Sequence, residues 1–331
     1  MQTLGSFMIY TRIVGSGSFL PTTVVSNNSL AKDLLSRGIH TSDDWIVQRT
    51  GIKQRYLAKD DINTSYMAVE SAKMALTDSG INASDIDLII VATSTPDCIF
   101  PSTACIVQSK LNANRAAAFD LQAACSGFVY ALSTAESFIC SKKAKNVLII
   151  GSEKFSRILD WNDRSTCVLF GDGAGAFVLT ASYDCGILSS CISSDGSISD
   201  ILSVSGHFEK GEIKGSPFVK MDGQSVFKNA VKVLEESARA VCNKACVDIS
   251  NVNWFIPHQA NIRIIKMLGR RLNVSDDKFI ITVDKHANTS AASIPLAFNV
   301  ARLDGRIKNG DLVLIQGVGG GFTWGSSLVR I

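Results

Sequence analysis

Short apolar runs alternate with stretches of helical periodicity along most of the chain, and this alternation restricts the possible folds more than any other feature. Apolar runs typical of buried strands lie at residues 88–91, 116–121, 147–150 and 176–179. Helical spacing of apolar residues lies between them, for example at residues 65–79 and 127–141. The alternation predicts an α/β fold with mainly parallel sheets buried between helix layers.

The same alternation begins again near residue 186. Helical stretches are expected at residues 224–241, 261–272 and 291–302, and strands at residues 254–256 and 279–283. Two further apolar stretches follow at residues 311–316 and 326–331. A chain of 331 residues is long enough for one large domain or two. We therefore expect two similar halves, residues 1–185 and 186–331.

Composition excludes several classes of protein. A hydrophobic content of 46% with 19% charged residues indicates a filled globular core. No apolar run reaches the ~18–20 residues of a membrane helix. The N-terminus lacks a charged start followed by an apolar block, so no signal peptide is expected. A net charge of +3 is too small to indicate a nucleic-acid partner.

The nine cysteines show no regular spacing, and their number is odd. This favours a reducing compartment over a disulfide framework, so we expect a cytoplasmic location. Cys242 and Cys246 stand one helical turn apart, but no histidine or second cysteine pair accompanies them. Two half-buried helix cysteines are favoured there over a metal site.

Cys125 stands where a strand-like run gives way to helical spacing, in the segment A-F-D-L-Q-A-A-C-S-G-F. It is therefore expected at a helix N-terminus, where unpaired N–H groups and the helix dipole stabilise a thiolate. The alternative is a buried, inert cysteine. Small neighbours on both sides favour a catalytic nucleophile, because they leave space for a substrate to reach the sulfur.

Two other polar segments also follow strand-like runs. P-H-Q-A-N contains His258, and H-A-N-T-S contains Asn288. Active sites of α/β proteins lie at such strand ends. The cysteine can form a covalent bond while the other two groups hydrogen-bond or exchange protons with a reacting carbonyl. The alternatives are a core histidine for His258 and a helix N-cap for Asn288.

Two glycine-rich segments differ in what they predict. G-V-G-G-G-F-T-W-G, residues 317–325, allows the backbone to approach a ligand and, with the Cys125 amide, to form an oxyanion hole. A hairpin turn without a ligand is the alternative. G-D-G-A-G-A, residues 171–176, lacks the Gly-Lys-Ser/Thr of a phosphate loop and precedes a strand-like run. Close backbone packing near the active-site floor is expected there.

Taken together, these motifs resemble the β-ketoacyl-[acyl-carrier-protein] synthase III family of condensing enzymes. The matching segments are A-A-C-S-G-F, P-H-Q-A-N-I-R, H-A-N-T-S-A-A-S, G-G-G-F-T-W-G, S-D-D-W-I-V-Q-R-T-G-I and F-G-D-G-A-G-A. The similarity runs from near Met8 to Ile331, so the first seven residues are expected to be an extension. The resemblance implies a thiolase-like fold of five layers, αβαβα, built from two pseudo-equivalent halves with the active site between them.

The resemblance also implies the chemistry. Cys125 would attack an acyl-CoA primer and become acylated. His258 and Asn288 would then hold the thioester carbonyl of malonyl-acyl carrier protein while carbon dioxide leaves. The amides of Cys125 and Gly320 would form the oxyanion hole. Loss of carbon dioxide drives the reaction, so no metal or redox cofactor is expected.

A coenzyme A site is implied as well. Trp45 and Arg164 match the pair that sandwiches the adenine ring, a role that suits indole and guanidinium planes. Arg49 matches a phosphate-contacting arginine, and Gly223 matches a residue of the channel. Thr41 and Asn261 match neighbours of the pantetheine or nucleotide. Lys53 stands where the family usually has a second arginine, so it keeps the charge and loses the bidentate fork. The alternative for Trp45 is an anchor between surface and core.

Two protein partners are implied. Arg263, Lys266 and Arg270 share one face of the expected helix at residues 261–272, with Arg271 beside them. A solvated basic face is the alternative, but acyl carrier proteins are strongly acidic and Arg263 matches the family's carrier-docking arginine. Phe100 would reach the acyl tunnel of a second copy, so a homodimer is expected.

Three rival functions remain open from the sequence. A condensing enzyme of secondary metabolism would keep the fold and use another acyl group. An inactive homologue would have lost the nucleophile, whereas Cys125, His258 and Asn288 are all present. A cysteine hydrolase would release free acid, but the G-S-C-W-type peptidase surroundings are absent.

Overall fold

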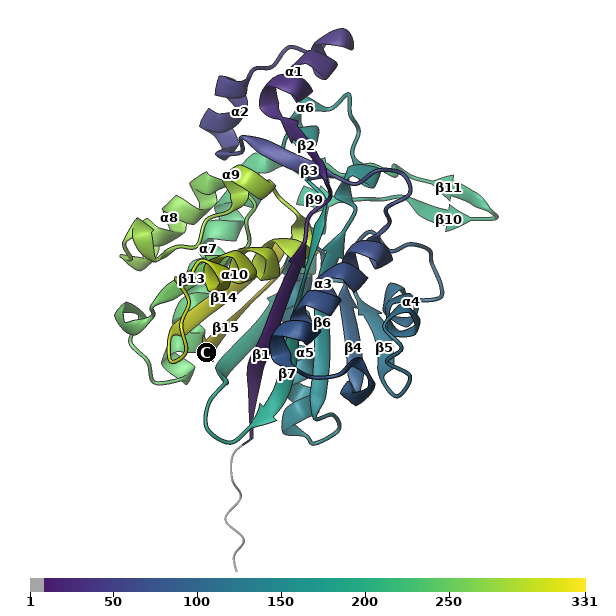
Figure 1. The fold of residues 1–331 in the computed structure, drawn as a ribbon. Coiled ribbons are helices and arrows are strands. Elements are labelled where there is room, and N and C mark those ends of the chain that lie inside the picture. Colours follow the sequence, from purple (N-terminus) through teal and green to yellow (C-terminus); the bar gives the residue numbers. More distant parts are fainter. Residues whose placement is uncertain (1–8) are drawn as a thin grey trace, which may run out of the picture.

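The computed structural model describes residues 9–331, and the extension expected at residues 1–7 lies outside the described residues. Two sheets dominate the fold (Figure 1). The first has the order β1 (Tyr10–Phe19), β7 (Gly173–Ser182), β6 (Asn146–Glu153), β4 (Leu88–Ala92) and β5 (Ala117–Leu121). The second has the order β8 (Ile187–Ser194), β15 (Thr323–Arg330), β14 (Leu312–Gly319) and β13 (Trp254–Pro257).

The two sheets repeat one pattern of strand directions. From β1 to β5 the pairs are antiparallel, antiparallel, parallel and parallel. From β8 to β13 they are antiparallel, antiparallel and parallel, and a single parallel bridge between Phe255 and Phe279 takes the place of the fourth pair. The expected division at residue 185 falls between β7 and β8. The division into two halves at that residue stays a prediction.

Alternate residues of the first sheet face two different helix layers. In β4, Leu88 and Ile90 belong to the central core, which also contains residues of α5 (Gly127–Cys140) and α10 (Ser293–Leu303). Ile89 and Val91 belong to a second core with α3 (Thr64–Ser79) and α4 (Thr103–Lys110). A strand that is buried on both faces consists of a continuous apolar run, so the sequence pattern predicted β4.

The second sheet is also covered on both faces. In β14, Val313 and Ile315 face the central core, while Leu312 and Leu314 pack in a third core with α7 (Gly223–Lys244) and α8 (Ile262–Leu272). Helices α5 and α10 therefore lie between the sheets, with α3 and α4 outside one and α7 and α8 outside the other (Figure 1). The five expected layers are present.

The remaining elements are short or lie at one end of the molecule. Helices α1 (Asn27–Ser36) and α2 (Asp43–Thr50) and strands β2 (Thr23–Ser26) and β3 (Gln54–Leu57) form that end, at the top of Figure 1. The other short elements are α6 (Arg164–Cys167), α9 (Val283–His286), β9 (Leu202–Ser203), β10 (His207–Glu209), β11 (Glu212–Lys214) and β12 (Lys220–Met221). Short 3-10 helices are η1 (Ala83–Asp85), η2 (Ala124–Ser126), η3 (Phe155–Ile158), η4 (Gly196–Ile201), η5 (Ile249–Asn251), η6 (Asp276–Lys278) and η7 (Ser290–Ala292).

Two predictions about the sheets were wrong. Neither sheet is mainly parallel, because each contains two antiparallel pairs. In the second sheet, β14 returns directly as β15 through a tight turn, and tight turns join antiparallel strands. Residues 279–283 do not form a strand: Phe279 makes one bridge, and α9 begins at Val283. The side-chain oxygen of Gln259 accepts hydrogen bonds from the amides of Thr282 and Val283, at 2.8 and 3.2 Å. This side chain satisfies N–H groups that a neighbouring strand would otherwise have paired.

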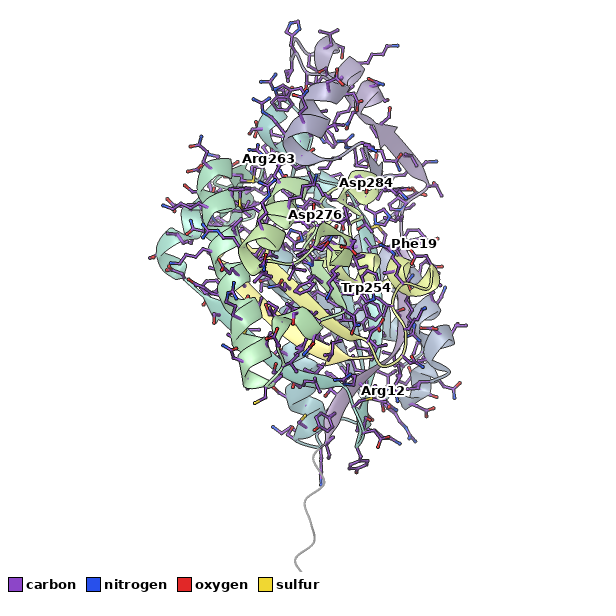
Figure 2. The ribbon with its side chains drawn as sticks, turned by 90° about the vertical axis from the view of Figure 1, so that its left-hand side faces the viewer. Arg12, Phe19, Trp254, Arg263, Asp276 and Asp284 are labelled. Atoms are coloured by element: carbon purple, nitrogen blue, oxygen red, sulfur yellow. The ribbon has the colours of Figure 1, made fainter. Side chains whose placement is uncertain are left out.

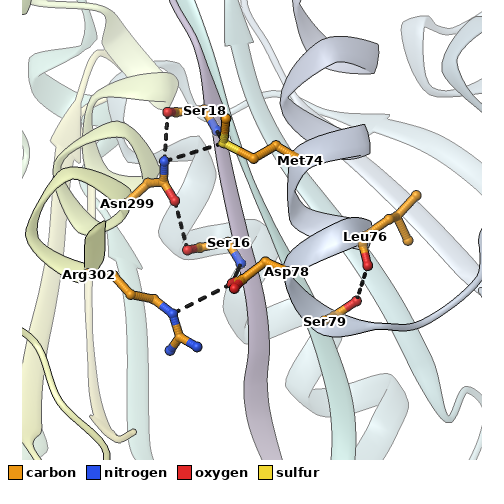
Figure 3. Close-up of polar contacts among 8 residues, drawn as sticks. All are labelled: Ser16, Ser18, Met74, Leu76, Asp78, Ser79, Asn299 and Arg302. Carbon is orange, nitrogen blue, oxygen red and sulfur yellow. Dashed lines mark hydrogen bonds and ion pairs between the residues drawn. The ribbon is translucent and has the colours of Figure 1, made fainter. Parts of the chain in front are cut away.

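Polar contacts tie α10 to the first sheet and its outer helix (Figure 3). The Asn299 side chain accepts a hydrogen bond from the Ser16 hydroxyl, at 2.9 Å, and donates one to the Ser18 oxygen, at 2.8 Å. Arg302 pairs with Asp78 of α3 at 3.6 Å. These contacts join the C-terminal part of the chain to the N-terminal part. Within residues 9–331, no helix is both long and apolar enough to cross a membrane.

Candidate active site

Cys125 lies in the turn between β5 and α5, as predicted. It is the middle residue of η2, and α5 begins two residues later. Its neighbour Ala124 has a φ of +46°, an uncommon conformation for a residue other than glycine. The turn therefore holds the cysteine at the helix N-terminus, with 4% of its surface exposed.

The expected thiolate is not supported. Burial raises the pKa of the Cys125 thiol to about 12, a hydrogen bond with the Ser290 side chain lowers it, and the Glu153 carboxylate raises it further. Loss of water around a buried sulfur outweighs the backbone N–H groups of the helix start. The free enzyme therefore holds a protonated cysteine, which must lose its proton during the reaction.

His258 directly follows β13, and its backbone N–H donates to the Gln316 carbonyl at 2.8 Å. Its Nδ1 lies 2.6 Å from the Ser293 hydroxyl, which also accepts the Gln259 N–H at 3.2 Å. The Ser293 hydroxyl accepts the amide and keeps its own hydrogen, which it can donate to Nδ1; in that arrangement the neutral ring carries its proton on Nε2. Burial lowers the pKa of His258 to about 3, so the ring is neutral near pH 7.

Asn288 is held through its own amide oxygen. That oxygen accepts the Ser290 N–H at 2.9 Å, and the Asn288 backbone N–H donates to the Leu169 carbonyl, also at 2.9 Å. Helix α10 begins at Ser293 with Ala292 as its N-cap, so the alternative of Asn288 as the cap of that helix was wrong. With the oxygen engaged, the side-chain NH₂ is the group that Asn288 can offer to a ligand.

The three predicted catalytic residues line one cavity of about 620 Å³, together with Phe170, Val318 and Gly319. A second cavity, of about 420 Å³, also reaches Cys125. Its apolar lining includes Phe155, Ile158, Phe170, Leu202 and Val219. Cys125 therefore lies where two cavities meet, one containing the His258 and Asn288 side chains and the other lined by these apolar residues together with Ser94, Gln122, Ser199 and Ser203.

The glycines of residues 317–325 bring β14 against the cysteine turn. A Cβ atom on Gly319 would lie 2.6 Å from the Cys125 nitrogen, and one on Gly317 would lie 2.9 Å from the Ser126 Cα. The segment is also a hairpin turn, because Gly319 pairs with Thr323. Gly320 lines the second cavity with Cys125. Its role in an oxyanion hole stays a prediction.

Two family models match the chain, "3-Oxoacyl-[acyl-carrier-protein (ACP)] synthase III" at residues 119–196 and the C-terminal part of the same family at residues 242–331. A curated β-ketoacyl-[acyl-carrier-protein] synthase III from Bordetella petrii is 60% identical, over 99% of this chain and 100% of that protein. The chain belongs to the β-ketoacyl-[acyl-carrier-protein] synthase III family. The family resemblance of the six motifs is thus confirmed.

Solved structures agree with this synthase III assignment. The 3-oxoacyl-[acyl-carrier-protein] synthase III of Aquifex aeolicus is 48% identical with a TM-score of 0.90, covering 97% of this chain and 100% of that one. The priming β-ketosynthase of the R1128 polyketide pathway is 32% identical with a TM-score of 0.91, covering 97% of this chain and 96% of that one. The thiolase-like α/β fold is confirmed.

Most residues expected at the coenzyme A site of this synthase III chain line the larger cavity, namely Trp45, Arg49, Gly223 and Asn261. The guanidinium carbons of Arg49 and Arg164 each lie 4.4 Å from the Trp45 ring centroid. Arg164 thus stacks directly on Trp45, with no space for a base between them. Arg164 and Thr41 do not line the cavity, although the Thr41 hydroxyl oxygen is buried and has no hydrogen-bond partner.

Asn261 has a structural role at the start of α8. Its side-chain oxygen caps α8 by accepting the Arg263 N–H at 2.9 Å, and its NH₂ donates to the Arg49 carbonyl at 3.0 Å. One residue therefore fixes α8 against α2, which carries Trp45 and Arg49. Lys53 is exposed in the synthase III structure, and its backbone N–H donates to the Asp284 carbonyl at 2.9 Å.

The basic residues of α8 are exposed, whereas Ile264, Ile265 and Leu268 are buried, as the spacing predicted. Of the basic residues Arg263, Lys266, Arg270 and Arg271, only Arg263 lines the larger cavity. Figure 2 places Arg263 on the upper part of the molecule, toward the end that carries α1 and α2. Phe100 lines neither cavity and is 82% exposed.

Residues 171–176, Cys242 and Cys246 were expected to have packing roles. A Cβ atom on Gly175 would lie 2.7 Å from the Pro295 Cβ, so residues 171–176 do pack closely, with β7 against α10. Cys246 lies beyond the end of α7 and is exposed, so the expectation of two half-buried helix cysteines was wrong. All nine cysteines are free, and residues 9–331 contain no cluster of three metal-binding side chains.

Sequence reasoning missed four residues that shape the synthase III site: Glu153, Gln259, Ser290 and Ser293. All four are buried, with at most 2% of their surface exposed. Ser290 and Ser293 lie in the H-A-N-T-S-A-A-S motif, so the motif contained a signal for them. Glu153 ends β6, which follows the helix that begins after Cys125, and nothing local in the sequence connects the two residues.

Proposed function

We propose that this chain condenses an acyl-CoA primer with malonyl-acyl carrier protein, giving a 3-oxoacyl-carrier protein, CoA and carbon dioxide. This acyltransferase reaction would initiate type II fatty-acid biosynthesis. The observation that carries the proposal is the position of Cys125, where a cavity containing His258 and Asn288 meets a second one partly lined by Phe155, Phe170 and Leu202. The 60% identity to the Bordetella petrii synthase supports the same substrates.

In the first half-reaction, the Cys125 sulfur attacks the primer thioester and releases CoA. The second cavity suits the acyl chain on its apolar side, where Phe155, Phe170 and Leu202 offer it no polar group to desolvate. The CoA arm then occupies the larger cavity between Cys125 and Trp45. Backbone amides of Cys125 and Gly320 hold the oxyanion, and one such donor typically contributes ~3 kcal/mol of transition-state stabilisation.

In the second half-reaction, the malonyl thioester carbonyl lies between His258 and Asn288. The Nε2–H of His258 and the side-chain NH₂ of Asn288 both donate to that oxygen as the enolate forms. A neutral histidine suits this task, because it keeps its Nε2 proton throughout and acts as a fixed donor. The carbanion then attacks the acyl-cysteine and frees the sulfur.

Binding of coenzyme A requires one local movement. Arg164 must leave its stack on Trp45 to admit the adenine ring, after which indole and guanidinium planes flank the base. Arg49 remains near Trp45 for the phosphates, and the unpartnered Thr41 hydroxyl can hydrogen-bond the nucleotide arm. The proposed reaction needs no metal or redox cofactor.

The proposal includes two protein partners and a location. The exposed basic residues of α8 begin beside the larger cavity and suit an acidic carrier protein. Exposed Phe100 and Ile99 suit burial against a second copy of the chain. Nine free cysteines are typical of a reducing compartment, in keeping with a cytoplasmic enzyme.

Intact-mass analysis tests this function. The protein is incubated with a panel of acyl-CoAs, and the adduct is located by peptide mapping. Malonyl-acyl carrier protein is then added and the products are identified. An acyl group on Cys125 that becomes a 3-oxoacyl-carrier protein supports the proposal. Free acid would indicate a hydrolase, and acylation only by an unusual donor would indicate secondary metabolism.

A further inference from the structure

Glu153, the last residue of β6, carries a carboxyl group that is buried without a cation. Its exposed fraction is 0%, and the ion pairs within residues 9–331 do not include it. Its oxygens instead accept hydrogen bonds from the Ser94 backbone N–H and from the hydroxyls of Thr93, Thr95 and Ser290. An uncompensated buried carboxyl group is costly, so its position calls for an explanation.

Ser290 connects this carboxyl group to the nucleophile. Its hydroxyl donates to Glu153 Oε1 at 3.0 Å, so toward the Cys125 sulfur the Ser290 oxygen is the accepting partner. Its backbone N–H donates to the side chain of Asn288, and its φ of +51° is unusual for a serine. The chain therefore holds Ser290 in one uncommon conformation in which its hydroxyl lies between a thiol and a carboxylate.

Cys125 needs a proton acceptor that His258 and Asn288 do not supply. The thiol is protonated in the free enzyme, because burial raises its pKa. His258 is a poor base, because its Nδ1 is engaged by Ser293 and burial lowers its pKa to about 3. Burial raises the pKa of Glu153 to about 7, so this carboxylate is a far better base than an exposed one.

We propose that Ser290 and Glu153 form a relay that takes up the Cys125 proton during acyl transfer and returns it at the end of turnover. The Ser290 hydroxyl gives its hydrogen to Glu153 Oε1 while its oxygen takes the hydrogen of the thiol. The sulfur forms its bond to the acyl carbon, and the bond from that carbon to the CoA sulfur breaks. CoA leaves as a thiolate and takes a proton from water.

The second half-reaction restores the relay. The carbanion attacks the acyl-cysteine, and the bond between the acyl carbon and the Cys125 sulfur breaks. The proton on Glu153 then returns through Ser290 to the sulfur. The relay gains and loses one proton per turnover, and the net proton consumed is the one found on CoA. This account of the condensing cycle rests on the proposed function.

The other charged groups near Glu153 have partners elsewhere. The Lys154 ammonium donates to the carbonyls of Lys59 and Ile62, at 2.7 and 2.9 Å. Asp172 accepts from the backbone N–H groups of Ala58 and Ser156, both at 2.8 Å. The residues that face the carboxyl group itself are Thr93, Ser94, Thr95 and Ser290, none of which titrates in the neutral range. Cys125 is therefore the titratable group to which Glu153 is coupled.

The pH profile of Cys125 acylation tests the relay. The full-length wild type and the variants Glu153→Gln and Ser290→Ala are mixed with acetyl-CoA between pH 6 and pH 9.5, and the adduct is followed by intact mass. With the relay, the rate rises as Glu153 ionises near pH 7 and then levels off. Without it, the rate follows the free thiolate and rises about tenfold per pH unit to pH 9.5. We expect the second profile for both variants, with rates at pH 7.5 at least tenfold below wild type.

Thr93→Val is the matched control, because it removes a donor to the same carboxylate and leaves Ser290 untouched. Its rate should still level off at high pH, with the inflection moved upward, because the Thr93 hydrogen bond lowers the pKa of Glu153. A level profile in Glu153→Gln or Ser290→Ala would overturn the relay, as would a uniform loss of rate at every pH. Alkylation by iodoacetamide gives a readout that does not depend on the acyl substrate. If condensation fails while the alkylation profiles of wild type and variants differ as expected, the proposed function is wrong and the relay stands. If condensation proceeds and the wild type and the variants show the same pH profile, the relay is wrong and the proposed function stands.

Discussion

Burial acts in opposite directions on the pKa values of Cys125 and His258, which both line the larger cavity. It raises the pKa of the Cys125 thiol and lowers that of the His258 imidazole, because the charged form of each group is the one that loses hydration. Both groups are therefore neutral at pH 7. The sulfur starts as a poor nucleophile that needs a base, and the imidazole is a donor that needs no proton from solvent.

Replacing the nucleophile should stop the first half-reaction. In Cys125→Ser, the acyl-enzyme should be undetectable after incubation with acyl-CoA, because a buried hydroxyl is a much weaker acid than a thiol. Intact mass with peptide mapping measures this. Cys105→Ser, at an exposed cysteine, is the control and should acylate normally. A stable acyl group on any other cysteine of the wild type would contradict the assignment.

His258→Ala and Asn288→Ala should separate the two half-reactions. Each removes one donor to the enolate oxygen, so malonyl decarboxylation should fall by ~10²–10³-fold while acylation of Cys125 remains measurable. Release of carbon dioxide and the acyl-enzyme mass are followed in parallel. Loss of acylation before loss of decarboxylation would show that the division of tasks is wrong.

The pH dependence of decarboxylation follows from the direction of the His258 shift. The pKa falls from its ordinary 6.5 to about 3, so the neutral donor form is present throughout pH 5–9. The decarboxylation rate of pre-acylated enzyme should therefore show no step near pH 6.5. A rate that falls as pH rises through 6.5 would mean that an imidazolium is required.

The sequence predicted which residues meet at the site and failed to predict their charge states. Cys125, His258 and Asn288 follow apolar runs, and such positions are readable because buried strands have a distinct composition. The pKa of Cys125 depends on how much water the folded chain excludes and on Glu153, which local sequence does not connect to the cysteine. The charge states of the site residues therefore depend on burial by residues distant in the sequence, which a local pattern does not show.

At the scale of elements, the glycines of β14 allow it to touch the cysteine turn. Gly319→Ala would place a methyl group 2.6 Å from the Cys125 nitrogen, against backbone that cannot easily move. We expect a loss of about 1–3 kcal/mol in the free energy of unfolding and a large loss of acylation rate. Gly196→Ala is the control, since no atom lies within 4 Å of its added Cβ, and it should be neutral. Unchanged acylation in Gly319→Ala would show that the turn is not held by this contact.

The exposed face of α8 belongs to the same scale. Arg263→Glu or Lys266→Glu should raise the apparent KM for malonyl-carrier protein several-fold at low salt, with a smaller effect at high salt. Primer acylation should change little. Lys308→Glu is the control, because Lys308 is exposed and precedes the start of β14, whereas Gly319 and the cysteine turn lie at the other end of that strand. Steady-state kinetics at two ionic strengths measure these effects. An equal loss of rate in both half-reactions would exclude this face as the docking site.

Elements with their own apolar pattern were predicted to within a few residues, as α3, α5 and α8 show. The error at residues 279–283 arose because those residues are as apolar as a strand but receive their hydrogen bonds from Gln259. A side chain that substitutes for a neighbouring strand leaves no mark in hydrophobic periodicity. The same limit explains the wrong expectation of mainly parallel sheets, since strand direction depends on connections.

The whole molecule should be a homodimer. Phe100 and Ile99 are 82% and 69% exposed, and burial against a second copy would remove both from water. Sedimentation at micromolar concentration measures the assembly. Phe100→Ala should weaken the dimer or shift primer preference, whereas Leu303→Ala, at another exposed apolar residue, should do neither. A fully active wild-type monomer would contradict this expectation.

The close approach of β14 to the cysteine turn also bears on how such an enzyme can change over time. Cys125 precedes α5, whereas His258 and Asn288 come from the part of the chain that forms the second sheet, so the distance between reacting groups is set by packing between the two sheets. A substitution that loosens this packing would misalign the reactants well before the chain loses its ability to fold. Selection for turnover should therefore constrain the glycines along this contact, Gly317 and Gly319, as tightly as it constrains the nucleophile.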